Sequence, residues 1–285
     1  MKIALASCAN LPDWEIDDQP LIDEFRESGV DISIPAWDQD IDWSIFDACL
    51  LRTTWDYTLR ITEFRNWIDR VSQQTILLNN ADIVHWNSDK RYLKDLSEKG
   101  VSIAPTVWLE ESKDILTILK EKEWSKAFLK PIVGACAYDT LRFTESEARI
   151  AQRLLDKVLP TSGMMLQPYL ERVETEGEFS AIYFAGELSH CVQKIPVSGD
   201  YRVQDDYGAF DQSIDPISGL IDLAEQSLAA IEEDWLYARV DALRMEDNTW
   251  VLNELEMIEP SLFFRHSKTA ARQLAQATIN KVNSL

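Results

Sequence analysis

The chain has 285 residues, 46% of them hydrophobic, and a formal net charge of −21 at pH 7. This length and this apolar fraction predict one large or two medium folded domains and exclude a largely disordered chain. The acid excess excludes a general nucleic-acid-binding or anionic-membrane surface, because attraction to phosphate needs an excess of lysine and arginine.

The first 85 residues alternate strand and helix patterns. Strands are predicted at 2–8, 30–37 and 47–54, and helices at 20–29 and 62–74. Gly29 is expected to close the first helix and Thr62 to cap the second. This order favours a parallel sheet whose strands are joined by helical crossovers.

After about residue 85 the pattern becomes a mixture of helices and hairpins. Helices are predicted at 88–100, 112–122, 147–159, 217–233 and 266–283. Strands or hairpins are predicted at 127–143, 164–171, 178–196 and 236–257, with a loop at 198–216. An α/β start followed by an α+β remainder predicts two or three subdomains around a cleft.

Neither a membrane segment nor a disulfide framework is expected. The longest apolar runs, such as AIYFAG at 181–186, have strand length, whereas a bilayer-spanning helix needs about 20 residues. The N-terminal run indicates a first strand rather than a targeting segment. The four cysteines are scattered without metal-type pairs, which fits a reducing cytoplasm.

The most informative hairpin ends in VLNELEM, which carries Glu254 and Glu256 on one face of a strand. A two-residue turn at Asp247-Asn248 would pair Asp241 with Glu254 and Arg239 with Glu256. One face then gathers three acids and one arginine. Directly opposed like charges destabilise a sheet by about 0.2–1 kcal/mol per pair, so this arrangement needs a physical reason.

Three explanations suit this acidic face. It can be a solvated surface without a specific role. It can bind a divalent cation, because hard oxygen ligands suit Mg²⁺, which usually shares the phosphates of a substrate. It can also supply the acid and the base of a glycosidase.

Three cations lie in patterns that suit an anion. Lys130 ends an apolar strand in AFLKPIVGACA, and the small residues 134–137 would let backbone N–H groups approach a phosphate. Lys90 lies in the first turns of the helix predicted at 88–100, and Arg202 lies in the loop GDYRVQDDYG. Each of the three, taken alone, is also consistent with a solvated side chain.

Two lysines, a loop arginine and a late Asp…Glu-x-Glu hairpin, in this order, resemble the ATP-grasp superfamily of carboxylate–amine ligases. The resemblance covers about residues 85–285. It implies an α/β plus α+β, ATP-grasp fold with an N-terminal Rossmann-like parallel-sheet domain at 1–85. A central lid subdomain at 86–163 and a C-terminal subdomain at 164–285, which carries the metal hairpin, complete the implied organisation.

The resemblance also implies roles for individual residues. Lys90 and Lys130 would contact ATP, and Arg202 would stabilise the transferring phosphate, with Lys130 as its catalytic partner. Further nucleotide contacts would come from Gln167, Tyr169, Leu170, Glu171 and Glu178. The ligands of Mg²⁺, or of Mn²⁺ as the alternative metal, would be Asp241, Glu254 and Glu256. Glu256 replaces the family's asparagine, and the small-residue turn is GACA rather than glycine-rich.

The motifs LLRTTWDY, WNSDKRYL and ELEMIEPSLFF resemble a narrower group, which includes the cyclo-ligase that closes O-ureido-D-serine to D-cycloserine. In this group Arg52 would bind a substrate carboxylate, together with Trp55 and Asp56.

The implied activity is the ATP-dependent joining of a small carboxylate to an amine through an acyl-phosphate, with release of ADP and phosphate. A homodimer is the family-level expectation, and neither nucleic acid nor membrane is an expected partner. The alternatives are a non-catalytic ATP-binding protein of the same fold and a paired-carboxylate glycosidase.

Overall fold

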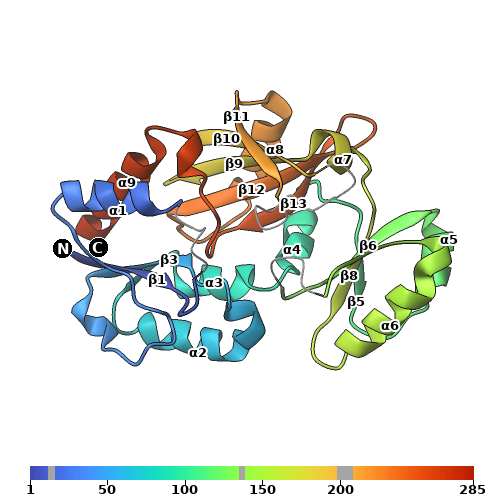
Figure 1. Ribbon diagram of the computed structural model, residues 1–285, viewed down its shortest axis with the longest axis horizontal. Helices are drawn as coiled ribbons and strands as arrows, with labels where there is room; N and C mark the ends of the chain where they lie inside the picture. Colours follow the sequence, from blue (N-terminus) through green and yellow to red (C-terminus); the bar gives the residue numbers. More distant parts are fainter. Residues whose placement is uncertain (12–16, 135–138, 198–207) are drawn as a thin grey trace.

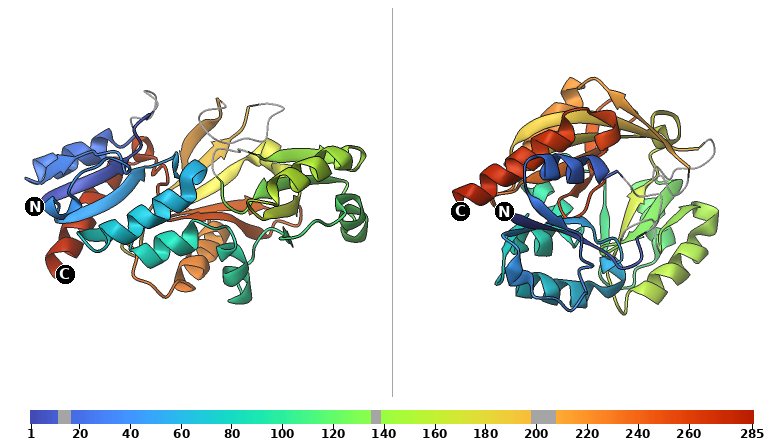
Figure 2. Two further views of the ribbon diagram at one scale, coloured as in Figure 1. Left: turned by 90° about the horizontal axis from the view of Figure 1, so that it is seen from below. Right: turned by 60° about the vertical axis from the view of Figure 1, so that its left-hand side comes forward.

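The computed structural model describes residues 1–11, 17–134, 139–197 and 208–285. In these residues the strands form three sheets, of four, five and four strands. The sheets follow one another along the long axis of the molecule, and both termini lie at the end opposite the third sheet (Figures 1 and 2). No helix in the described ranges has the length and apolar character required to cross a bilayer.

The first sheet has the strand order β2-β1-β3-β4, and all its strand pairs are parallel, as predicted. Its elements are β1 (Lys2–Ser7), β2 (Asp31–Ser33), β3 (Ala48–Thr53), β4 (Ile76–Leu78), α1 (Gln19–Glu27) and α2 (Ile61–Val71). The closing role of Gly29 is confirmed, since its φ is 74° and its N–H donates to the Arg26 carbonyl. The predicted cap at Thr62 is wrong, because α2 already begins at Ile61 and Arg60 holds the cap position. Strand β4 had not been predicted.

The second sheet is antiparallel with the strand order β11-β10-β9-β12-β13. Its elements are β9 (Glu178–Phe184), β10 (Glu187–Ile195), β11 (Phe210–Ile214), β12 (Tyr237–Arg244), β13 (Trp250–Glu256), α8 (Ser218–Ala229) and α9 (Ala270–Ser284). The two faces of β9 alternate between two cores. Ile182 and Phe184 pack against the first sheet, α1 and α9, whereas Ala181 and Tyr183 pack against α8. Strand β11 lies within the predicted loop 198–216, so that prediction is wrong for residues 210–214.

The third sheet is antiparallel with the strand order β5-β8-β6-β7. Its elements are β5 (Val107–Leu109), β6 (Lys126–Pro131), β7 (Leu141–Thr144), β8 (Met164–Pro168), α5 (Ile115–Lys122) and α6 (Ala148–Val158). The two helices share an apolar core with the strands and form one end of the molecule (Figure 1). Strand β8 belongs to this sheet. The predicted division between 86–163 and 164–285 falls before Met164, whereas a boundary between the third and second sheets falls after Pro168.

The helix predicted at 88–100 begins later than expected, as α4 (Tyr92–Glu98), and a helix that was not predicted, α3 (Ala81–Asn87), precedes it. Asn87 ends α3 because its side chain bonds the backbone of β13 and its exit, donating to the Leu255 carbonyl and accepting from the Met257 N–H. Lys90 therefore lies in the connection between two helices, and its backbone N–H donates to the Ile132 carbonyl at 2.7 Å.

The short helix α7 (Arg172–Glu176) ends at Gly177, whose backbone no other residue tolerates well. Its φ and ψ are 73° and −154°, and an added Cβ would lie 1.9 Å from the Lys194 carbonyl oxygen. We expect Gly177→Ala to lower the free energy of unfolding by about 3 kcal/mol, from backbone strain and the clash. Gly186→Ala is the matched control, since its φ is 86° with nothing within 4 Å of the added Cβ. Urea unfolding curves that shift equally for both variants would contradict the clash.

Candidate functional site

The register of the β12–β13 hairpin confirms the predicted pairing of the acidic face. Arg239 pairs with Glu256, and Asp241 pairs with Glu254. The register shifts by one residue beyond Asp241, where Ala242 pairs with Leu252. Asn253 is therefore the extra residue of a β-bulge.

The predicted two-residue turn is wrong, and the bulge explains why the acids still pair as expected. The Met245 N–H donates to the Thr249 carbonyl, so three residues form the turn, and Asn248 takes a φ of 68°. The longer turn shifts the pairing of the two strands by one residue relative to the prediction. The bulge at Asn253 shifts it back by one residue, so Asp241 pairs with Glu254 as predicted.

Lys90 and Lys130 both reach the Glu254 carboxylate. Their Nζ atoms lie 2.9 Å and 3.3 Å from Glu254 Oε1. The Lys130 side chain is 9% exposed and that of Glu254 is 23% exposed, so the cluster lies at the edge of solvent. Two elements that are 40 residues apart in the chain thus converge on one carboxylate of the hairpin.

Glu254, Lys90 and Lys130 shift one another's pKa values. Burial alone would raise the pKa of Glu254, but the two ammonium groups lower it to about 2. Burial lowers the pKa of Lys130, and Glu254 offsets this only in part, whereas Glu254 raises the pKa of Lys90 despite burial. The carboxylate is therefore ionised between the two lysines at neutral pH.

Asp241 is buried and already saturated with donors. It accepts hydrogen bonds from the Arg239 guanidinium and from the Ser180 hydroxyl, and Lys194 Nζ lies 3.2 Å away. Burial would raise the pKa of Asp241, but Arg239 and Lys194 lower it. Glu178 is the other partner of Lys194 and also accepts from Asn253. Glu178 thus lies inside this buried network.

Glu256 shares the Arg239 guanidinium with Asp241, at 2.5 Å from Arg239 Nη2. Burial, with Asp241 and Glu254 nearby, raises the pKa of Glu256 to about 7 against the opposing effect of Arg239. Burial and the neighbouring Glu256 also raise the pKa of Glu259 to about 8. Both carboxyl groups at this end of β13 therefore hold their protons more strongly than an ordinary glutamate does.

The donor chemistry of this face fits Mg²⁺, whereas the present side-chain arrangement is not a closed metal cage. Among the described residues, no three histidine, cysteine, aspartate or glutamate side chains are arranged to hold a metal ion. Mg²⁺ needs no such cage, because it usually takes one or two carboxylates and completes its shell with water and substrate phosphates. Glu254 and Glu256 remain partly exposed, at 23% and 32%, and can serve in this way.

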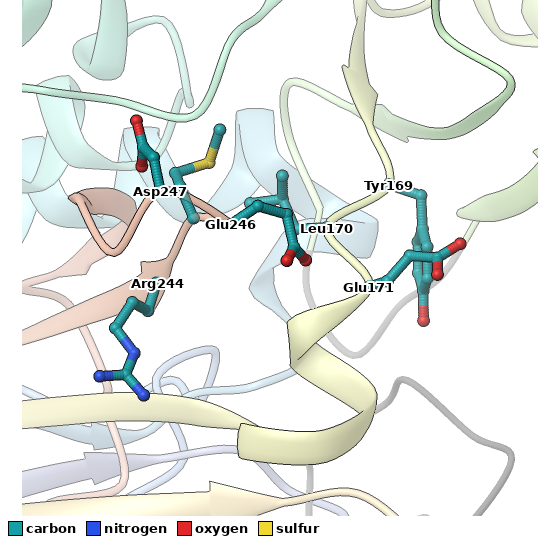
Figure 3. A pocket seen from close by; sticks show the side chains of 7 residues that line it. Tyr169, Leu170, Glu171, Arg244, Glu246 and Asp247 are labelled. Carbon is teal, nitrogen blue, oxygen red and sulfur yellow. The ribbon is translucent and has the colours of Figure 1, made fainter.

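A pocket of about 320 Å³ opens between the end of β8 and the β12–β13 turn. Figure 3 shows Tyr169, Leu170 and Glu171 on one side and Arg244 on the other. Met245 in its wall lies four positions after Asp241 along the chain, a span of roughly 13 Å in extended backbone. The pocket thus lies along the hairpin from the charged cluster, and its volume is at the lower limit for ligand pockets.

The other predicted nucleotide contacts around β8 differ in exposure. Gln167 is buried and donates to the Thr106 hydroxyl at 2.9 Å. The Tyr169 ring packs against the Lys126 ammonium, 3.9 Å from the ring centroid. The Glu171 side chain is 73% exposed and lies at the rim.

The predicted substrate residues have partners inside the protein. Arg52 makes a bidentate ion pair with Asp18, at 2.8 and 2.9 Å. Its Nη1 is buried and donates no hydrogen bond to any described residue. Trp55 Nε1 donates to the Glu259 carbonyl at 3.2 Å. Asp56 accepts from Trp37 and Arg60 within the first domain.

Arg202 and the turn residues Ala135, Cys136 and Ala137 lie outside the described residues. Sequence reasoning also missed contributors to the cluster. Lys194 and Ser180 carry no motif that separates them from ordinary strand residues, and Glu259 lies in the motif ELEMIEPSLFF without a predicted role. Only the three-dimensional pairing of β9, β10 and β12 brings Ser180 and Lys194 to Asp241.

Comparison with known proteins identifies relatives of this chain. Residues 3–79 match the family model described as "D-cycloserine synthetase DcsG, N-terminal domain". Cycloserine biosynthesis protein DcsG from Streptomyces lavendulae is 31% identical over 282 residues, covering 94% of each chain. The crystal structure of D-cycloserine synthetase DcsG superimposes with a TM-score of 0.90 at 30% identity, covering 99% of this chain and 100% of that one.

A more distant structure shares the fold. D-Alanine–D-alanine ligase from Bacillus anthracis, solved in complex with ATP, superimposes with a TM-score of 0.70 at 16% identity, covering 100% of this chain and 98% of that one. The resemblance to ATP-grasp ligases and the expected α/β plus α+β fold are thus confirmed. The chain belongs to the DcsG family of ATP-grasp ligases and is an ATP-dependent ligase.

Proposed function

We propose that the protein uses Mg-ATP to join a small, amino-acid-like carboxylate to an amine through an amide-type C–N bond. The observation that carries this proposal is the convergence of Lys90 and Lys130 on Glu254. One buried and one partly buried ammonium group beside a carboxylate-rich hairpin are suited to the phosphates and the metal of a nucleotide. Phosphate is also the leaving group that a carboxylate needs before an amine can displace it.

The proposed reaction has two steps. A carboxylate oxygen of the substrate bonds to the γ-phosphorus of ATP as the bond to ADP breaks. The amine nitrogen then bonds to the acyl carbon, phosphate leaves, and the amine loses a proton. Positioning and charge neutralisation are the main contributions of a protein to such chemistry.

Each charged side chain then has a role in our proposal. Lys90 and Lys130 bind phosphate oxygens and move away from Glu254 when they do so. Glu254 and Glu256 would coordinate the metal ion. Asp241, which Arg239 holds in place, would add its negative charge to the same face of the hairpin. When bound, Mg²⁺ neutralises phosphate charge and orients the chain of phosphates. Arg202 keeps its proposed role on the transferring phosphate.

The remaining nucleotide sites follow from the pocket. We propose that the adenine end occupies the space between the β8 exit and the β12–β13 turn, lined by Tyr169, Leu170 and Glu171. Gln167 and Glu178 support this wall and the charged cluster from within.

Since ATP is required, we place the reaction in the cytoplasm. The division into three units is retained, with the second boundary moved to follow β8.

On the substrate side, we propose that Arg52, Trp55 and Asp56 line the acceptor end. The orphaned Nη1 of Arg52 supports a contact with a substrate carboxylate, because a buried guanidinium N–H without an acceptor is costly. The names of the relatives point to amino acids, since one is a D-cycloserine synthetase and the other joins two D-alanines.

A thermal-shift experiment tests the proposal. A nucleotide at a hundredfold excess over its dissociation constant stabilises the folded state by about 2.7 kcal/mol, which raises the melting temperature by roughly 5 °C or more. We expect this shift with Mg-ATP and Mg-ADP, and ADP release with at least one amino acid and amine. A shift without ADP release from any pair would indicate a non-catalytic ATP-binding protein. No shift with nucleotide would remove the ATP site.

A further inference from the structure

The carboxylates of the hairpin's acidic face, and the neighbouring Glu178, all have cations as partners. Four acidic side chains pair with four basic ones. The ion pairs are Glu178 with Lys194, Asp241 with Lys194 and Arg239, Glu254 with Lys90 and Lys130, and Glu256 with Arg239. A carboxylate that is paired in this way is not open to a metal ion, since the ion would have to displace its partner.

The four cations come from two parts of the molecule. Two belong to the second sheet itself, on β10 and β12. The other two reach it from outside, because Lys130 lies on β6 of the third sheet and Lys90 lies just before α4. The Lys90 N–H also donates to the Ile132 carbonyl just beyond β6, at 2.7 Å. Lys90 and Lys130 are thus tied to each other, and neither belongs to the hydrogen-bond ladder of the second sheet.

The two ammonium groups on Glu254 oppose the approach of a free cation. A hydrated divalent cation that reached this carboxylate would displace at least one of them. The Lys130 side chain is 9% exposed, so its displaced charge would stay partly desolvated and unpaired, which costs free energy. Nucleotide phosphate removes this cost, because its oxygens give both lysines a new partner.

We propose that Lys90 and Lys130 act as internal counter-ions that close Glu254 to free divalent cations, so that its metal site opens only when nucleotide phosphate takes both ammonium groups. This inference rests on the proposed function and adds an order to it, in which phosphate binds the lysines first or arrives together with its metal. Binding of phosphate and binding of metal are then coupled, and each strengthens the other by the same factor.

Electron paramagnetic resonance of Mn²⁺ tests this closure without nucleotide. At about 0.15 M salt, which screens weak attraction to the acidic surface, the unchanged protein should bind Mn²⁺ at Glu254 no tighter than roughly 1 mM. Lys130→Ala and Lys90→Met should each gain one Mn²⁺ site per chain that is at least about tenfold tighter. The same variants should lose affinity for ATP, so the two effects have opposite signs. Ion pairs with a purely structural role predict no gain.

Three further variants identify the source of the gain. Lys120→Ala removes one positive charge from an exposed position on α5 and measures the effect of net charge alone. Lys130→Arg keeps the charge and should keep the site closed. Glu254→Gln in the Lys130→Ala background should abolish the gained site. Circular dichroism checks the fold of each variant, and if one lysine variant unfolds, the other decides.

Calorimetry with ADP in excess EDTA tests the order of binding. The unchanged protein should bind metal-free ADP, and Lys130→Ala should bind it at least about tenfold more weakly. The inference is overturned if the unchanged protein binds no metal-free ADP or already has the tight Mn²⁺ site. It is also overturned if the lysine variants gain no more than Lys120→Ala, or if the gain survives Glu254→Gln.

These outcomes are separable from those of the ligase proposal, because the Mn²⁺ titration contains no nucleotide. A gained Mn²⁺ site in a protein that releases no ADP with any acid and amine would retain the closure of Glu254 and remove the ligase proposal. ADP release by a protein whose unchanged form already binds free Mn²⁺ tightly would retain the ligase proposal and remove the closure.

Discussion

Glu254→Gln should lower Mg-ATP-dependent ADP release by about a hundredfold or more. Both Lys90 and Lys130 converge on the Glu254 carboxylate, at 2.9 Å and 3.3 Å. Glutamine keeps the shape and one acceptor oxygen, so each lysine retains a hydrogen-bond acceptor. It loses the negative charge that a metal ion needs. The loss is therefore expected in turnover rather than in folding.

A coupled ADP-release assay measures this effect, and circular dichroism checks the fold of the variant. Glu232→Gln is the control, since that side chain is 82% exposed on the loop between α8 and β12, pairs only with the exposed Lys99 among the described residues, and should leave turnover unchanged. Full turnover by a folded Glu254→Gln protein would count against any role of Glu254 in metal binding.

Lys130→Ala should weaken ATP binding by well over tenfold. The Lys130 side chain is 9% exposed, and it extends from β6 of the third sheet to Glu254 on β13 of the second sheet, 3.3 Å away. An ammonium group in such a partly desolvated site interacts with phosphate more strongly than a solvated lysine does. Removing it also leaves Glu254 with only Lys90 as a partner.

Calorimetric titration with Mg-ATP measures the affinity directly. Lys120→Ala, an exposed lysine on α5, is the matched control and should bind as the unchanged protein does. If Lys130→Ala bound Mg-ATP with unchanged affinity, Lys130 would not belong to the nucleotide site, and its ion pair with Glu254 would be structural.

How far the sequence could predict the site depends on how local each feature is. Alternation along one strand places Glu254 and Glu256 on the same face. The pairing of Asp241 with Glu254 was predicted from a two-residue turn, and it is confirmed because the bulge offsets the longer turn that is present. Alternation cannot reveal a bulge, so the position of Asn253 and its bond to Glu178 were out of reach.

Features that depend on distant partners were less accessible. The break between α3 and α4 arises because Asn87 bonds the backbone around β13, 168 residues further along the chain. Helical spacing alone continues through this break. The ion pair of Arg52 with Asp18 joins residues 34 apart, and it changes Arg52 from a free cation into one with a single orphaned nitrogen.

The fold itself was more predictable than its details. Parallel order in the first sheet follows from alternating strands and helices, whereas β4, β5 and β11 are short strands whose local patterns are weak. Phe210 at the edge of the second sheet is 62% exposed, so β11 has no buried face to mark it in the sequence. Such edge strands are specified by their neighbours rather than by their own residues.

A crystal structure of the protein with Mg²⁺ and a non-hydrolysable ATP analogue would test the central claim most directly. We expect the metal ion on Glu254 and Glu256 or Asp241, the phosphates on the ammonium groups of Lys90 and Lys130, and the base between the β8 exit and the β12–β13 turn. Electron density for the nucleotide elsewhere, with both lysines still bound to Glu254, would contradict the account.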